Sequence, residues 1–466
     1  MPSLDPLAEL EELLGPAGVL RDPADLARHT EPFRGPAGPT PAVARPRSVE
    51  EVREVVRWAR RHRRRLLPQG ANTGLVGAST PPPAGSTDPQ PVVVSLELLD
   101  GEPVVDPVDR TAVVRAGTRL STLEMAAAPH GLTMPIDLGA DPTLGGMVAT
   151  NTGGARMLRH GDVRRHVLGI RAVVADEGCT VVDELTTLRK HNNGPSLSQA
   201  FVGSSGAFGI ITDVAVELEA LPAARACAWV IPVGDDQALE ALLLLERGYG
   251  TWLEAFEVVS REALAAGLPL SDAARPFGER EPELAVLVEL SGRADVEDRL
   301  VEALADLFDA GLLEDAVVAD AGRAWLPRHG ISEGLRRLGT VVGSDVSVPR
   351  PALPRFRRVA RERVAERFPG AIVADFGHWG DGGVHCNVVL PDGAGAEEVA
   401  AVRELVLGLA VREFGGSFSA EHGIGPVNAD WWRATVPPAT RALVEGMKQL
   451  FDPLGVLGHP GLPFGG

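Results

Sequence analysis

Two stretches of the chain combine glycine with small polar residues, and they restrict the fold more than any other feature. The first runs from Pro68 to Gly77, directly after Leu66 and Leu67, and the second runs from Leu138 to Gly154. Glycine lets backbone N–H groups approach a pyrophosphate closely, and neighbouring Asn and Thr side chains can donate to phosphate oxygens. Neither stretch forms G-x-G-x-x-G after a strand, so the ordinary dinucleotide-binding fold is not supported. Each loop alone is more often a simple turn.

Length and charge exclude several classes of protein. A chain of 466 residues exceeds what one hydrophobic core usually supports, so two or three domains are expected. The 45 basic and 63 acidic residues give a formal charge of -18, which disfavours binding to nucleic acid or to an anionic membrane surface. Only two lysines occur, Lys190 and Lys448, so arginine must provide nearly all anion binding. Three widely spaced cysteines fit a reducing compartment and argue against a disulfide framework.

The chain shows no targeting or membrane-spanning pattern. Met1 to Gly15 carries Asp and Glu where a secretion signal would carry basic residues and then an apolar core. No stretch is apolar for the ~18 residues that a membrane span needs. A cytoplasmic location is therefore expected.

Local patterns predict a mixture of helices and strands. Ser48 and Glu51 have capping-box spacing, and apolar residues follow at helical intervals up to the basic run 60–65, which is typical of a solvated helix end. Strand-like runs occupy residues 92–96, 111–116, 170–175, 208–218 and 284–290. Helical patterns occupy residues 239–245, 296–312 and 440–451, and composition changes near Leu221 and again near 415–425. The expected fold class is α+β.

Histidines and a carboxylate in the last quarter of the chain suggest a metal site. Residues 375–390 read as strand, glycine turn and strand, which lets His378 and His385 approach each other across a hairpin. Glu421 follows in Ser419 to Gly425, beside His422. Two imidazoles and one carboxylate with an open position form a recognised catalytic zinc or manganese set. The alternative is satisfied core histidines and a surface glutamate.

Four motifs in order give the chain a family resemblance. They are Pro68 to Gly77, Met134 to Gly139, Gly145 to Gly154, and the run from Leu188 to Lys190 through Phe201 to Thr212. The chain resembles FAD proteins of the vanillyl-alcohol-oxidase type, in the branch of D-lactate, D-2-hydroxyglutarate and glycolate dehydrogenases. The resemblance implies a two-part FAD-binding domain at 1–221, an α+β substrate cap at 222–420, and a C-terminal segment at 421–466 that returns to the FAD domain.

The resemblance also implies the residues that contact FAD. They are Pro68, Gly70, Ala71, Asn72, Thr73, Gly74, Leu75, Pro135, Gly145, Gly146, Thr150, Asn151, Gly153, Gly154 and Ile211. Relatives that attach flavin covalently use a histidine or a cysteine. The first glycine loop offers neither, so FAD is expected to be non-covalent.

Substrate and metal residues are implied in the same way. In similar enzymes the positions matching His378, His385 and Glu421 bind the metal, His422 matches the catalytic base, and Arg328, Ser332 and Asn387 match substrate contacts. The chain departs from the pattern before Asp345, where Gly343 and Ser344 replace a lysine and a tyrosine. That change leaves open which hydroxy acid is the substrate.

The expected function is an FAD-dependent dehydrogenase that oxidises a D-2-hydroxy acid to the 2-oxo acid, with a divalent metal, Zn²⁺ or Mn²⁺, binding the substrate. Two alternatives remain open: a metal-independent flavin oxidase of the same superfamily, and a non-catalytic flavoprotein subunit of an electron-transfer complex. The electron acceptor is not evident, whether a quinone, an electron-transfer flavoprotein or another, and a homodimer is compatible with the sequence.

Overall fold

The computed structural model describes residues 5–32, 37–270 and 275–464, and the chain divides into two compact units. The first unit contains residues 1–153, 162–221 and 421–466, and the second contains 154–161 and 222–420. Each unit therefore draws on separate stretches of the sequence. The short stretch 154–161, which follows the second glycine loop, belongs to the second unit.

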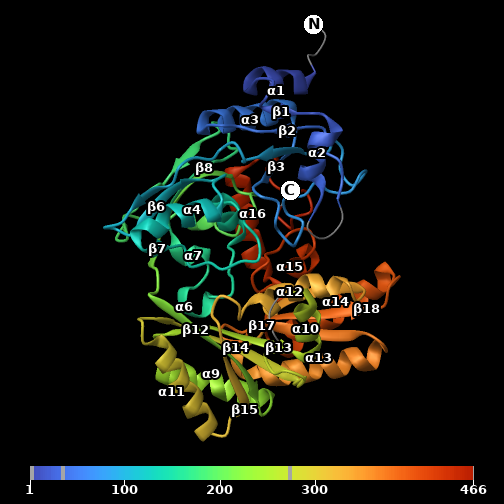
Figure 1. Ribbon diagram of the computed structural model, residues 1–466. Coiled ribbons are helices and arrows are strands. Elements are labelled where there is room, and N and C mark those ends of the chain that lie inside the picture. Colours follow the sequence, from blue (N-terminus) through green and yellow to red (C-terminus); the bar gives the residue numbers. More distant parts are fainter. Residues whose placement is uncertain (1–4, 33–36, 271–274, 465–466) are drawn as a thin grey trace. The chain divides into compact units, whose positions relative to one another are not determined.

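A four-stranded sheet in the first unit carries the first glycine loop. Its order is β1 (Val19–Leu20), β2 (Val43–Ala44), β4 (Val92–Ser95) and β3 (Leu66–Gln69), and β2, β4 and β3 run parallel. Helices α1 (Pro6–Leu14), α2 (Pro23–Thr30) and α3 (Val49–His62) accompany it (Figure 1). The Ser48 side chain accepts a hydrogen bond from the Glu51 N–H at the start of α3, so the predicted helix start is confirmed.

A five-stranded antiparallel sheet completes the first unit. Its order is β5 (Val104–Asp106), β6 (Thr111–Arg115), β10 (Ile210–Glu217), β8 (Val167–Val173) and β9 (Val181–Asp183). Strands β7 (Leu132–Thr133) and β11 (Glu219–Ala220) form a separate pair. The helices of this part are α4 (Leu120–Ala127), α5 (Leu144–Thr150), α7 (Val163–His166) and α8 (Ser198–Phe201).

The C-terminal segment is built into the first unit, as the family resemblance implies. It contains α15 (Ala429–Thr435) and α16 (Pro438–Phe451), and Leu457 then pairs with Leu66 of β3. The buried Lys448 ammonium donates to the Ala207 and Leu457 carbonyls at 2.8 and 3.0 Å and pairs with Asp452. These bonds satisfy a cation that would otherwise be costly to bury.

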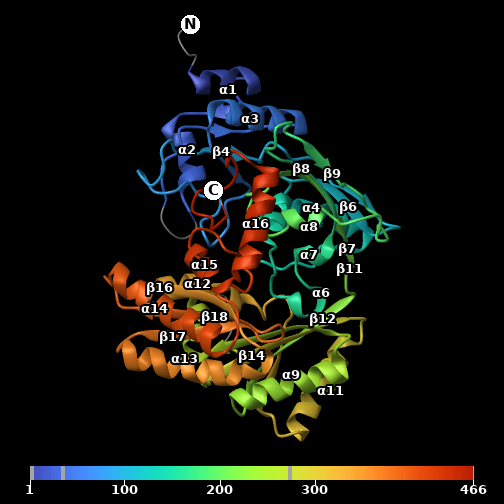
Figure 2. The same ribbon diagram turned by 180° about the vertical axis from the view of Figure 1, so that it is seen from behind.

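The second unit is a seven-stranded antiparallel sheet with helices on both faces. Its order is β15 (Leu313–Ala319), β12 (Ala224–Pro232), β14 (Leu284–Gly292), β13 (Leu253–Ser260), β17 (Ile372–His378), β18 (Gly383–Leu390) and β16 (Thr340–Ser347). One face packs against α9 (Asp235–Tyr249), α11 (Val296–Asp309) and α13 (Leu353–Arg367), as Figures 1 and 2 show. The unit also contains α6 (Met157–His160) and α14 (Ala396–Gly408).

The other face of this sheet packs against α10 (Arg261–Gly267) and α12 (Leu326–Arg336). Trp229, Phe376 and Ile331 belong to the apolar core between sheet and helices. Because side chains alternate along a strand, this face also receives Glu257, Asp345 and His385.

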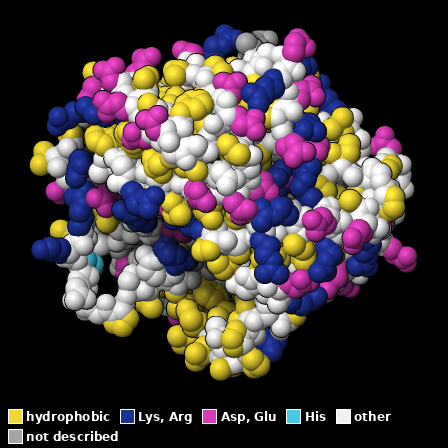
Figure 3. Space-filling view, turned by 90° about the horizontal axis from the view of Figure 1, so that it is seen from below, with side chains coloured by type: hydrophobic (Ala, Val, Ile, Leu, Met, Phe, Trp, Pro, Cys, Tyr) yellow, Lys and Arg dark blue, Asp and Glu magenta, His cyan; other side chains and the backbone are white. Residues whose placement is uncertain are grey.

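The molecular surface mixes charges of both signs. Figure 3 shows acidic and basic side chains interspersed over one face. Among the described residues, no helix combines the length and the apolar composition needed to cross a bilayer.

Candidate active site

The two glycine loops meet in the first unit. A Cβ placed on Gly70 would lie 2.2 Å from the Thr143 Oγ1 atom, and one placed on Gly145 would lie 2.6 Å from the Ala116 Cβ. Real side chains never come so close, so glycine is what lets the loop after β3 pack against the start of α5. Thr143 caps α5 by accepting from the Gly146 N–H. The first glycine loop and the start of the second therefore lie next to each other.

Asparagines fix the shape of both loops. Asn72 has a φ of 55°, donates to the Glu31 carbonyl at 2.9 Å and accepts from Ser79. Asn151 has a φ of 54° at the end of α5, donates to Asp162 at 2.7 Å and accepts from the Arg164 N–H. Asparagine tolerates this left-handed conformation better than most residues. These two asparagines hold loop backbone in place through their side chains.

The remaining predicted flavin contacts occupy the same part of the first unit, except Gly154. Ala71, Thr73, Gly74 and Leu75 lie in the loop after β3, and a Cβ on Gly74 would meet no atom within 4 Å. Thr150 ends α5 and Ile211 lies in β10. Gly153 and Gly154 are both buried, and the sequence division between the two units falls between them. Gly206 brings the fourth motif against Pro68, because its Cβ would lie 3.1 Å from the proline ring.

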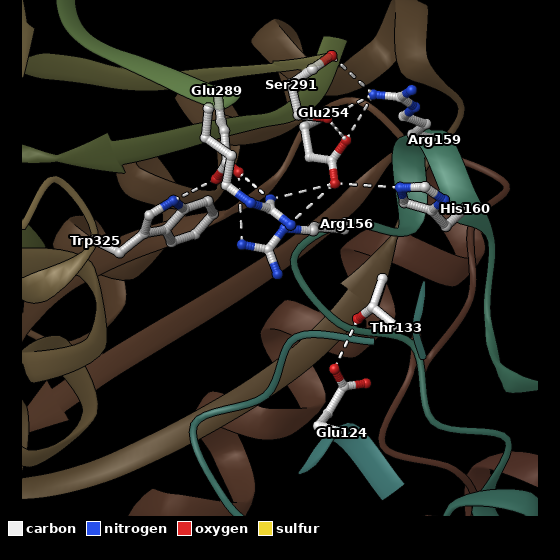
Figure 4. A network of polar contacts seen from close by, with 10 residues as sticks. Glu124, Thr133, Arg156, Arg159, His160, Glu254, Glu289, Ser291 and Trp325 are labelled. Carbon is white, nitrogen blue, oxygen red and sulfur yellow. Dashed lines mark hydrogen bonds and ion pairs between the residues drawn. The ribbon is translucent and has the colours of Figure 1, made fainter. Parts of the chain in front are cut away.

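Pro135 follows a segment that two hydrogen bonds to Glu124 hold in place. Glu124 of α4 accepts from the Thr133 hydroxyl at 2.8 Å, as Figure 4 shows, and from the Met134 N–H at 2.6 Å. The loops thus offer bare backbone, hydroxyls and open space, without bulky side chains. These donors fit a flavin nucleotide, whose phosphates are bound well by backbone N–H groups.

In the second unit, His378 and His385 lie on neighbouring strands of one hairpin. Their rings contact each other edge to face, with centroids 5.3 Å apart. The predicted hairpin and the approach of the two histidines are confirmed. Both imidazoles are mostly buried, with 11% and 14% of their side chains exposed.

Asp345 of β16 lies opposite His385 of β18, and no role had been predicted for it from the sequence. Its carboxylate oxygen is 3.5 Å from the His385 Nδ1 atom, and its Oδ2 atom and main-chain carbonyl accept from the Ala420 N–H. Glu421 and His422 follow Ala420 directly. One ligand atom from each of Asp345, His385, Glu421 and His422 lies within 4.8 Å of the others, a grouping that could hold a cation.

His378 is not a member of that group, although the resemblance implies it as a ligand. Its Nδ1 atom contacts the Oε1 atom of Glu257 in β13. A histidine that binds a metal usually donates its second ring N–H to a carboxylate, which leaves the other nitrogen for the ion. The contact with Glu257 therefore suits a ligand role for the Nε2 atom of His378.

Arg328 lies in the first turn of α12, held by the other oxygen of Glu257. Its Nε atom donates to the Oε2 atom at 2.7 Å, and its guanidinium lies over the Phe376 ring at 4.3 Å. The Phe376 ring in turn contacts His385, with centroids 5.1 Å apart. Because Nε makes the ion pair, the two terminal nitrogens of Arg328 form a fork that suits a carboxylate.

A second buried carboxylate anchors the start of α12. Glu289 of β14 accepts from the Trp325 indole N–H at 2.6 Å and pairs with Arg225. Figure 4 shows the neighbouring Glu254, which binds Arg159 at 2.8 Å, His160 at 3.2 Å and Ser291 at 2.6 Å. Burial raises the pKa of Glu254, but these hydrogen bonds and charges lower it to about 2. The bond between Glu289 and Trp325 fixes the start of the helix that carries Arg328.

The other predicted substrate contacts are placed by helix and strand periodicity. Ser332 lies four residues after Arg328, on the same side of α12. Asn387 is two residues beyond His385 in β18, is 5% exposed and donates to the His385 carbonyl at 3.2 Å. Gly343 is the strand partner of Asn387 and alternates with Ser344, which is 3% exposed on the opposite face.

Sequence reasoning missed Glu257, which contacts both His378 and Arg328. It lies in the apolar run 253–259, where a strand buries every residue, and it is 0% exposed. Burial raises the pKa of Glu257, but the charges of His378 and Arg328 lower it to about 2. Two carboxylates, Glu254 and Glu257, within a mostly apolar strand were the available signal, because such groups are rarely buried without a partner.

Two family models and several known proteins match this chain. Residues 40–182 match the family described as FAD binding domain, and residues 235–460 match the C-terminal domain of FAD linked oxidases. D-2-hydroxyglutarate dehydrogenase of Xanthomonas citri pv. viticola is 32% identical, over 98% of this chain and 96% of the relative. The mitochondrial D-2-hydroxyglutarate dehydrogenase of Bos taurus is 33% identical, over 98% of this chain and 82% of the relative.

A solved structure supports the fold. The chain matches p-cresol methylhydroxylase with a TM-score of 0.74 at 16% identity, over 97% of this chain and 95% of the other. Identity this low shows the fold alone, which is the two-domain FAD fold of the vanillyl-alcohol-oxidase type. With relatives above 30% identity over nearly the whole sequence, the chain belongs to the FAD-linked oxidoreductase family that contains the D-2-hydroxyglutarate dehydrogenases.

Proposed function

We propose that this protein oxidises a D-2-hydroxy acid to the corresponding 2-oxo acid, with non-covalent FAD as the hydride acceptor and a divalent cation, Zn²⁺ or Mn²⁺, at the histidine site. One observation carries the proposal. An arginine fork and a group of imidazoles and carboxylates line the same face of one sheet. A 2-hydroxy acid presents a carboxylate and an adjacent hydroxyl, which these two kinds of group bind.

Three residues bind and orient the substrate in this proposal. The Arg328 fork receives the carboxylate, and Ser332 on the same side of α12 donates from its hydroxyl. Asn387 lies next to the histidine site and contacts the hydroxyl end. Holding both ends of a small acid fixes the α-carbon in one orientation, which lowers the barrier to reaction.

His422 takes the hydroxyl proton. A neutral imidazole is the usual general base near neutral pH. His385, His378 and Glu421 hold the cation, and Asp345 either joins them or orients His385. A divalent cation held by these residues would lower the pKa of a coordinated hydroxyl, and bound FAD would supply the hydride acceptor. Glu421 lies 3.9 Å from the His422 Nε2 atom, so the base and a ligand are neighbours.

The test is anaerobic reduction of the bound flavin. Purified protein is mixed with D-lactate, D-2-hydroxyglutarate, D-malate or glycolate, with and without a chelator, and flavin absorbance is followed. We expect one of these acids to bleach the flavin and the chelator to slow the reaction at least tenfold. Bleaching that is indifferent to chelator, with rapid peroxide formation in air, would support the metal-independent oxidase instead. A protein that takes up no FAD would overturn the proposal.

Gly343 is expected to set the preference between mono- and dicarboxylates. It lies on the site face of β16 beside Asn387, where similar chains carry a lysine. Gly343→Lys supplies a cation for a second carboxylate, worth about 1.5 kcal/mol, or roughly tenfold. We expect kcat/KM for D-2-hydroxyglutarate relative to D-lactate to rise by about that factor. Gly343→Met controls for bulk, and an equal rise in that variant would contradict the electrostatic explanation.

A further inference from the structure

Glu257 lies in a strand whose residues are all buried, yet its carboxylate pairs with an arginine and a histidine. Its side chain is 0% exposed, and both of its oxygens have partners. Oε1 contacts the His378 Nδ1 atom, and Oε2 accepts from the Arg328 Nε atom at 2.7 Å. Burying a carboxylate costs several kcal/mol unless good partners compensate it. The two partners come from separate elements, α12 and β17, so a single side chain joins them.

The contact with His378 determines which ring nitrogen carries the proton. An ionised carboxylate accepts hydrogen bonds only, so the Nδ1 atom of His378 must carry the proton. The Nε2 atom then keeps its lone pair and can bind a cation. The edge-to-face packing on His385 further restricts rotation of the His378 ring.

The contact with Arg328 fixes the direction of the guanidinium. Nε is bound to Glu257 and the guanidinium plane lies over Phe376, so the group is held from its edge and from its face. The terminal nitrogens are left for a ligand carboxylate. Phe376 also contacts the His385 ring, so the arginine and both imidazoles form one packed group.

We propose that Glu257 is a positioning residue that joins the two halves of the site, holding the cation ligand His378 with one oxygen and the substrate clamp Arg328 with the other. The inference rests on the proposed function, because it assumes a cation near His378 and a carboxylate at Arg328. It follows that loss of the Glu257 side chain should weaken both the binding of the cation and the binding of the substrate carboxylate. A residue that only stabilised the fold would affect neither selectively.

Glu254 provides a matched control. It lies three residues earlier in the same strand, is 2% exposed and binds Arg159, His160 and Ser291. No described contact joins it to His378 or Arg328. Glu254→Gln removes the same charge from the same sheet and should destabilise the protein to a similar degree.

The experiment measures zinc affinity by competition with a chromophoric chelator, together with KM and kcat, on flavin-loaded protein. We expect Glu257→Gln to weaken zinc binding about 10- to 100-fold, as loss of an outer carboxylate usually does. KM should rise more than kcat falls. Glu254→Gln should keep the wild-type zinc affinity and KM. Glu257→Asp is the substitute if Glu257→Gln does not fold. It keeps the charge, but its side chain is one methylene shorter and cannot reach both partners. It should therefore show the same two defects, weaker zinc binding and a higher KM.

The outcomes separate this inference from the proposed function. Wild-type zinc affinity and KM in both Glu257 variants would overturn the positioning role and leave the proposed function intact. Equal losses in the Glu254 and Glu257 variants would also overturn it, because the effect would then be general. A wild-type protein that binds no divalent cation would overturn the cation site itself and the link through Glu257 with it.

Discussion

Replacing His422 with alanine is expected to slow substrate-driven flavin reduction about a thousandfold while leaving FAD bound, because a positioned general base contributes 10²- to 10⁴-fold. The side chain belongs to the group that also contains Asp345, His385 and Glu421, and it is not among the residues expected to contact FAD. Rapid-mixing absorbance under anaerobic conditions measures the rate, and absorbance after gel filtration measures the bound flavin.

A histidine outside the site gives the control for this variant. His130 is exposed in the first unit, so His130→Ala should reduce its flavin at the wild-type rate. Normal reduction by the His422→Ala protein would exclude the base. Loss of flavin from that protein would instead indicate a structural role.

Replacing Arg328 with lysine is expected to raise KM for the hydroxy acid roughly a hundredfold, which corresponds to about 3 kcal/mol. Lysine keeps the charge that Glu257 requires, so the fold should survive. It cannot make two parallel hydrogen bonds to a carboxylate. The change should therefore appear in KM first and in kcat to a smaller extent. Steady-state rates with a dye acceptor measure both constants.

Arg337 at the end of the same helix is the matched control, because its side chain is 62% exposed and it pairs only with Glu333 among the described residues. Arg337→Lys should leave KM unchanged. An unchanged KM in Arg328→Lys would show that the carboxylate binds elsewhere.

Local sequence signals were enough to predict parts of the fold. Capping residues and apolar spacing located α3, and glycine and alternating patterns located the hairpin of His378 and His385, because both depend on neighbours in the chain. The glycine loops could be recognised by their small side chains, which leave the backbone accessible. The structure explains Gly70 and Gly145, because a Cβ atom at these positions would clash with Thr143 and Ala116. The cation, its identity and the roles of Glu421 and His422 stay predictions.

Other parts of the site could not be read from the sequence. Glu257 of β13 contacts Arg328 of α12, 71 residues away, and His378 of β17, 121 residues away. Only strand order and register bring them together. Asp345 faces His385 for the same reason. The attachment of Arg159 and His160 to Glu254 likewise depends on where the stretch 154–161 folds. Contacts between residues so far apart in the chain produce no short sequence motif from which they could be predicted.

The return of the C-terminal segment has a consequence for biosynthesis. Strand β3 lies at the edge of its sheet, and the Leu66 N–H and carbonyl are satisfied by Val456 and Gly458. On the ribosome, residues 222–420 can fold before those partners have been made, whereas the open edge of β3 must wait until residues 456–458 have been synthesised. An exposed strand edge is prone to wrong pairing. The coenzyme site should therefore form later than the second unit, and a chaperone that shields this edge would raise the yield of active protein.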